Sequence, residues 1–218
     1  MNINKHLILL FSVLFFLFAV SVSSGCFRKN ESDVKSVVRN ELDQLKNLDS
    51  ETTQKYIPYT ELFPDATENT DLTDEINKTF SLFFRKFNYK ISDVIVGTAN
   101  HSATVSVKLT TIDSKVLARD FKAELLRTQI TESAQAQKGN IKDSSRSLEA
   151  HYLILNHLLN TNDYDTAETD CNIQLVNTGN DKKEKWKIQR TNSLEDDLVG
   201  GLIADLADPD ILSPEDTL

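Results

Sequence analysis

Residues 71–112 read DLTDEINKTFSLFFRKFNYKISDVIVGTANHSATVSVKLTTI, and their hydrophobic period changes near residue 88. Before that point the apolar residues recur every three or four positions, which predicts a helix over 71–87 with Asp71 or Thr73 as its N-cap. After it they alternate, which predicts an antiparallel hairpin of strands 89–97 and 102–112. Val105, Val107 and Leu109 face one side and polar residues the other, so one face of this hairpin is expected to meet water.

Similar patterns on either side extend this arrangement. Apolar residues at helical spacing predict helices over 31–49, 114–138 and 145–160. Alternation predicts a second hairpin, with strands over 167–175 and 185–188, and a last helical segment over 194–207 that Gly200 and Gly201 interrupt. The sequence therefore predicts an α+β fold, in which two antiparallel hairpins are packed by helices on one side.

The first 26 residues, MNINKHLILLFSVLFFLFAVSVSSGC, have the order of a lipoprotein signal peptide. Lys5 gives the positive start, the segment 7–20 is apolar except for Ser12, and small residues lead to Cys26. The apolar run is shorter than the roughly 17–25 residues of a membrane-spanning helix. We therefore predict lipidation of Cys26 and anchoring at the outer face of the cell membrane. A secretory signal cut near Ser23 and a retained span are the alternatives.

Composition limits the other classes of function. The chain has 24 basic and 33 acidic residues, a net charge of −9, and loss of Lys5 with the signal peptide makes it −10. So acidic a chain offers no basic surface for nucleic acid. We expect a signal peptide over 1–25, a tether over 26–32, one domain over 33–207 and an acidic tail over 208–218.

The mature chain resembles extracytoplasmic lipoproteins of Gram-positive bacteria that carry a nuclear-transport-factor-2-like (cystatin-like) domain. The resemblance rests on the opening helix VKSVVRNELDQLKNLD and on the late Trp186-Lys187-Ile188. Leu48-Asp49-Ser50 departs from the family, which has a glycine-containing turn after the first helix. The resemblance implies a curved antiparallel sheet packed by the N-terminal helices, with a cone-shaped cavity between sheet and helices. Compared with the minimal fold of the family, the helices at about 114–160 are long and form an insertion. The candidate lining residues are Phe80, Phe83, Phe84, Phe87 and Trp186, although such an aromatic stripe is more often plain core.

No set of catalytic or metal-binding residues is evident in the sequence. His151 and His157 are six residues apart, so they do not share a helix face as zinc ligands do, and His101 is expected in a solvent-exposed turn. The acidic stretch over 160–170 lacks the spacing of a calcium loop. Cys171, in a predicted strand, is expected to be a buried apolar residue. No phosphate-binding, dinucleotide-binding or nucleophile-elbow motif is present, so we expect no cofactor and no enzyme activity.

Three hypotheses about function follow. The first is a non-catalytic lipoprotein that binds a small apolar ligand or an envelope protein through the cavity or its rim. The second is a protein-interaction or inhibitory lipoprotein that uses the helices over 114–160, and it requires exposed apolar side chains there. The third, and least favoured, is an enzyme with an acid and a histidine in the cavity.

Overall fold

The computed structural model describes residues 30–57, 62–63, 66, 72–97, 101–136, 147–179 and 184–212. The predicted signal peptide, Cys26, the start of the tether and the end of the acidic tail lie outside them. The chain forms two compact units. One takes its described residues from 30–39, 93–105 and 173–189, and the other from 40–92, 106–172 and 190–212.

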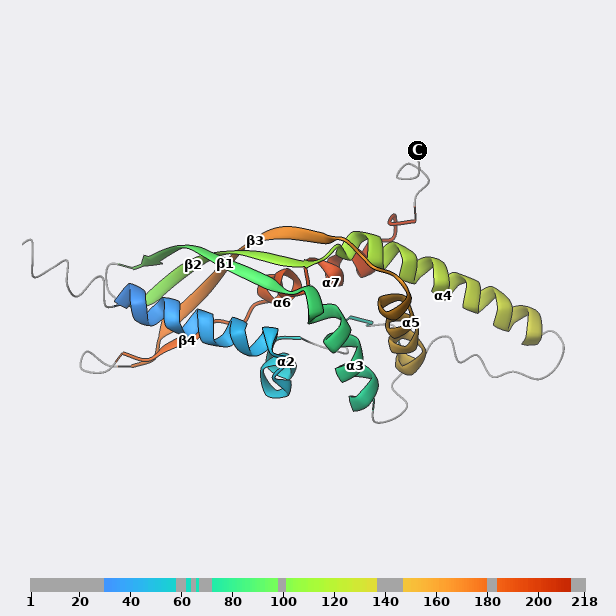
Figure 1. Ribbon diagram of the computed structural model, residues 1–218, viewed down its shortest axis with the longest axis horizontal. Coiled ribbons are helices and arrows are strands. Elements are labelled where there is room, and N and C mark those ends of the chain that lie inside the picture. The colour runs from blue at the N-terminus through green and yellow to red at the C-terminus, as the bar shows by residue number, and fades with distance from the viewer. Residues whose placement is uncertain are drawn as a thin grey trace, which may run out of the picture. The chain divides into compact units, whose positions relative to one another are not determined.

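The α+β architecture is confirmed (Figure 1). A helix over residues 30–46 precedes α2 (Ser50–Tyr56) and α3 (Thr73–Phe83). The strands β1 (Asn88–Val96), β2 (Ser102–Ile112), β3 (Thr166–Asn177) and β4 (Trp186–Ile188) form an open antiparallel sheet in the order β1-β2-β3-β4. Between the two hairpins lie α4 (Ser114–Ala136) and α5 (Leu148–Thr161), and the described chain closes with α6 (Asn192–Leu198) and α7 (Leu202–Ala207).

The two faces of the sheet differ as the alternation predicts. On β2 the side chains of Ala103, Val105, Val107 and Leu109 are buried, and on β3 those of Cys171, Ile173 and Leu175. The opposite face is polar, and its neighbouring strands are joined by side-chain contacts. Ser106 Oγ donates to Asn172 at 2.9 Å, and Lys108 Nζ lies 3.1 Å from Glu168 Oε2. The sheet therefore buries one face against the helices and exposes the other.

The predicted change from helix to strand near residue 88 is confirmed. α3 ends at Phe83, a short 3-10 turn covers Phe84–Lys86, and Phe87 is already extended, with φ −64° and ψ 130°. The predicted capping residue is wrong, because the N-cap of α3 is Leu72, which makes no side-chain capping bond. Thr73 is the first helical residue, whereas an N-cap side chain belongs to the residue just before the helix; Asp71 lies outside the described residues.

The helix over 30–46 ends in an unusual way. Leu48 has a φ of 60°, while its N–H donates to the Leu45 carbonyl and the Asp49 N–H donates to the Gln44 carbonyl. This is the hydrogen-bond pattern of a Schellman cap, whose left-handed position is usually glycine. A side chain there costs about 1 kcal/mol. Leucine at this position is therefore less favourable for the backbone than glycine would be.

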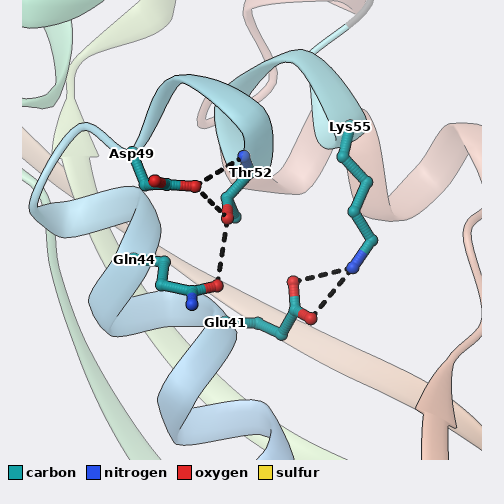
Figure 2. Close-up of polar contacts among 5 residues, drawn as sticks. All are labelled: Glu41, Gln44, Asp49, Thr52 and Lys55. Carbon is teal, nitrogen blue, oxygen red and sulfur yellow. Dashed lines mark hydrogen bonds and ion pairs between the residues drawn. The ribbon is translucent and has the colours of Figure 1, made fainter.

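Asp49 joins this helix end to the next helix (Figure 2). Its carboxylate is the N-cap of α2 and accepts from the Thr52 N–H at 2.9 Å and from the Thr52 hydroxyl at 2.7 Å. The same hydroxyl lies 3.0 Å from Gln44 Oε1 on the preceding helix. Lys55 then reaches back to both carboxylate oxygens of Glu41, at 2.9 Å each. Local polar contacts therefore fix the corner between the two helices.

The Asp49 cap predicts a pH dependence of stability. Hydrogen bonds from the Thr52 side chain and then from the Thr52 N–H lower the pKa of Asp49 below its ordinary value of 3.8. A carboxyl whose pKa is lowered by folding stabilises the fold above its ordinary pKa, and this stabilisation is lost as the pH falls through the folded pKa. Asp49→Asn keeps an acceptor but cannot ionise. We expect it to be less stable than the wild type at pH 7, and the difference to become smaller as the pH falls below 3.8, as measured by urea unfolding at pH 7 and pH 3. An equal difference at both values would contradict the assignment.

Candidate functional site

α4 begins in the core of the second unit and then leaves it. Leu117, Ala118 and Phe121 are buried, and α4 packs against α5 and α7. Beyond Phe121 the helix continues for four turns, and no residue over 122–135 is buried. In Figure 1 this part of α4 runs out beyond α5. We call residues 123–135 the α4 arm.

The outer face of the α4 arm carries two large apolar side chains. Leu126 is 49% exposed and Ile130 is 61% exposed. Leu126 follows the buried Leu117 by nine residues, and Ile130 follows the buried Phe121 by nine residues, which is two and a half helical turns in each case. Both side chains therefore lie on the side of α4 opposite its core-facing side. Core packing does not account for them.

α7 and the residues on either side of it hold the base of α4. Ser114 Oγ lies 2.5 Å from the Gly200 carbonyl oxygen and 2.6 Å from Asp205 Oδ2, and Lys122 Nζ donates to the Asp208 carbonyl. A cavity of about 200 Å3 lies beside this junction and is lined by Asp113, Lys115, Val116, Arg119 and Ile211. The start of α4 is thus rigidly attached, which positions the arm relative to the second unit.

The four candidate pocket-lining phenylalanines lie together in the second unit, in contact with one another. Phe80, Phe83, Phe84 and Phe87 are each no more than 3% exposed. The Phe84 ring centroid lies 5.5 Å from that of Phe83 and 5.2 Å from that of Phe87, both with edge-on geometry, and 6.2 Å from that of Phe80. In this arrangement they form aromatic core. Their role as pocket lining stays a prediction, as does that of Trp186, which lies on β4 in the first unit and donates from Nε1 to Glu184.

Among the described histidines, His101 belongs to the first unit, and His151 and His157 belong to the second. His101 and His157 are exposed. His151 lies against the rings of Phe63 and Phe121, with centroids 4.8 and 5.6 Å away, and its Nδ1 donates to the Ser147 carbonyl. Within the described residues no group of three or more histidine, cysteine or acidic side chains is arranged to hold a metal ion.

Cys171 is buried, as predicted from its strand position. Burial raises the pKa of its thiol, and the nearby negative charge of Asp197 raises it further. Burial also raises the pKa of Asp197, although the hydrogen bond with Cys171 partly opposes this shift. A thiol that stays protonated is a poor nucleophile, so this pair belongs to the core rather than to a reactive site.

The acidic residues over 160–170 are partly neutralised by lysines. Lys86 Nζ lies 2.7 Å from Asp163 Oδ1 and also donates to the Tyr164 carbonyl. This ion pair lowers the pKa of Asp163. Lys108 lies 3.1 Å from Glu168 and 3.9 Å from Asp170. Asp163 precedes β3, whereas Glu168 and Asp170 lie on the solvent-exposed face of β3 and share Lys108.

Comparison of the chain with protein families, with curated proteins and with solved structures found no match in any of the three. In the part of the chain that the structure describes, no helix has the length and apolar character needed to cross a membrane. The lipoprotein signal and the family resemblance therefore stay predictions from the sequence.

The interaction hypothesis required exposed apolar side chains on the helices over 114–160, but Leu126 and Ile130 were not identified, because only the inward-facing residues of α4 were assigned. The sequence did contain a signal for these exposed residues, because Leu126 and Ile130 lie nine residues after Leu117 and Phe121 and so on the opposite side of the helix. The cavity at the base of α4 had no comparable signal. Ile211 is 92 residues from Arg119, and only the fold brings them together.

Proposed function

We propose that this protein is a lipid-anchored, extracytoplasmic binding module that acts without catalysis and holds another protein of the cell envelope through the α4 arm. The observation that carries the proposal is the pair of exposed apolar side chains on the side of α4 opposite the core. Isolated exposed apolar residues are ordinary on protein surfaces. Two of them one turn apart, on a helix that extends beyond the packed core, form the apolar stripe that a partner protein covers in helix-mediated recognition.

The expected energetics are moderate. Fully burying a leucine or isoleucine contributes about 1.5–3 kcal/mol, and these two side chains still have about half of that area to bury. Together they contribute about 2 kcal/mol, or about thirtyfold in affinity. Arg127 and Glu124, 3.2 Å apart beside the stripe, neutralise each other. We therefore expect the partner's contact surface to be apolar at its centre and to lack a strong net charge.

Replacing both apolar residues tests this surface. The variant Leu126→Lys/Ile130→Lys, recovered from its own membranes after mild crosslinking, should capture the partner at least about tenfold less than the wild type. Its free energy of unfolding should change by no more than about 0.5 kcal/mol, because both positions are exposed. Gln135→Lys is the matched control, because Gln135 is exposed on the opposite side of the arm, nine residues from Leu126. Equal capture by the double variant and the control would refute the proposal.

The anchor is tested separately, by mass spectrometry of the mature N-terminus. We expect Cys26 to be the first residue and to carry acyl chains, since stable attachment needs two or more of them. Cys26→Ala should then release the protein from the membrane. An unmodified Cys26, or a chain that keeps residues 1–25, would contradict the anchoring.

A further inference from the structure

The start of the helix over 30–46 is attached to the hairpin of β3 and β4 within the first unit. Asn30 is only 8% exposed, and its Nδ2 donates to Glu184 Oε1 at 3.0 Å. The other oxygen of this carboxylate accepts from Trp186 Nε1 at 3.2 Å. In Figure 1 the blue start of this helix and β4 lie at the same end of the sheet. The Glu184 carboxylate therefore joins the first turn of the fold to the start of β4.

The length of the tether limits how far this junction lies from the proposed anchor. Cys26 precedes Asn30 by four residues, so even a fully extended chain separates their Cα atoms by no more than about 14 Å. An acylated Cys26 lies at the membrane surface, because its acyl chains are buried in the hydrocarbon. The β3–β4 hairpin is therefore held close to the lipid headgroups. This step rests on the proposed acylation of Cys26.

The hairpin presents positive charge at this place. Lys185 and Lys187 flank the buried Trp186, and both are exposed. Neither ammonium group forms an ion pair with any residue that the structure describes. The nearby carboxylate of Glu184 is already occupied by two donors.

The charge of the surrounding sequence differs from that of the rest of the chain. The segments 26–33 and 181–187 together contain six basic and four acidic residues, a net charge of +2. The rest of the mature chain has a net charge of −12. An anionic membrane surface repels the acidic remainder and attracts lysines that lie near it. Charge therefore favours the same orientation as the short tether.

We propose that the β3–β4 hairpin of the first unit docks on the membrane that holds the anchor, with Lys185 and Lys187 against the phosphate groups of anionic lipids. A lysine near an anionic membrane surface contributes about fivefold to binding. Two of them therefore favour the docked over the undocked orientation by about 25-fold. The lipid anchor supplies the attachment, and the two lysines set the orientation of the first unit.

Quenching by a headgroup-labelled lipid tests this orientation. Thr178→Cys places a fluorophore beside Lys185, because the Thr178 N–H donates to the Lys185 carbonyl at 2.8 Å, whereas Cys171 is buried and escapes labelling. The acylated full-length mature chain is placed in vesicles of equal parts phosphatidylcholine and phosphatidylglycerol, doped with a lipid that carries a nitroxide on its headgroup. We expect strong quenching in these vesicles. It should be largely lost when phosphatidylcholine replaces phosphatidylglycerol, or at about 1 M salt, which screens surface charge.

Charge reversals separate this contact from a general effect of net charge. Lys185→Glu/Lys187→Glu should lower the ratio of docked to undocked protein at least about 25-fold. Lys78→Glu/Lys90→Glu is the matched control, since it makes the same change in net charge at two exposed lysines of the second unit. This control should leave the quenching unchanged. Equal quenching in the two double variants, or in the two lipid compositions, would overturn the proposal.

Flotation of the same vesicles on a density gradient distinguishes this failure from failure of the anchor. Every variant should float with the vesicles, because the acyl chains hold the protein in either orientation. A chain that floats without quenching overturns the docked orientation and leaves the anchor and the α4 arm untouched. A chain that does not float overturns the anchor, and the docked orientation with it.

Discussion

Phe84→Ala is expected to lower the free energy of unfolding by about 3–5 kcal/mol, the usual cost of deleting a buried phenylalanine ring. Phe84 is 2% exposed, and its ring contacts those of Phe80, Phe83 and Phe87. Alanine leaves a cavity that three large neighbouring rings cannot easily fill. Since a domain is stable by only about 5–15 kcal/mol, this loss is a large share of the total. Urea unfolding followed by circular dichroism measures it.

Phe84→Leu is the matched control. Leucine keeps most of the buried apolar volume, so we expect a loss of about 1–1.5 kcal/mol. The comparison also bears on the predicted pocket-lining role. If the aromatic cluster is core, both variants lose stability in proportion to the volume removed. If Phe84 instead borders an open pocket, alanine should cost little more than leucine, and that outcome would contradict the core assignment.

Gly200→Ala is expected to destabilise the protein by about 2–4 kcal/mol. Gly200 has a φ of +67°, where an L side chain costs about 1 kcal/mol. A Cβ there would also lie 2.2 Å from Thr111 Oγ1, which belongs to a buried residue of β2. Overpacking of this kind adds about 1–3 kcal/mol. The same glycine accepts a hydrogen bond from Ser114 at the base of α4, so its displacement would also disturb the start of that helix.

Two comparisons isolate the clash. Gly201→Ala has a similarly unfavourable φ of +90°, but the nearest atom to a new Cβ is 3.6 Å away, so it should cost only about 1 kcal/mol. Adding Thr111→Ala to Gly200→Ala should restore part of the loss, because it removes the atom that clashes. Thr111→Val, which keeps the branched shape, should restore none. Equal costs at the two glycines would show that the close approach to Thr111 has no energetic weight.

Hydrophobic periodicity predicted the helices and strands well in segments where a single period, helical or alternating, is clear. The change of period at residue 88 located the junction between α3 and β1, and the Gly200–Gly201 pair correctly separated α6 from α7. Both signals are local, since backbone conformation there follows from neighbouring residues. The N-cap of α3 was mispredicted, because Asp71 and Thr73 flank the position that actually precedes the helix.

The extent of the core, the two compact units and the candidate site could not be predicted from the sequence, because they depend on contacts between distant segments. The helical pattern over 114–138 shows which residues face inward, but not how far along the helix the core extends. Leu117 and Phe121 are buried, whereas Leu125, on the same face, is only half-buried. Likewise, the two compact units interleave three segments each, and such a division has no signature in a linear sequence. The α4 arm and the cavity at its base are both products of this long-range organisation.

The most direct test of the proposed partner surface is site-specific photocrosslinking in intact cells. A photoreactive side chain placed at position 130 should form a crosslink to one envelope protein. The same group at position 135, on the opposite side of the arm, should form it at least about tenfold less. Crosslinks of equal yield at both positions, or none from position 130 while the protein is at its normal level in the membrane, would contradict the account.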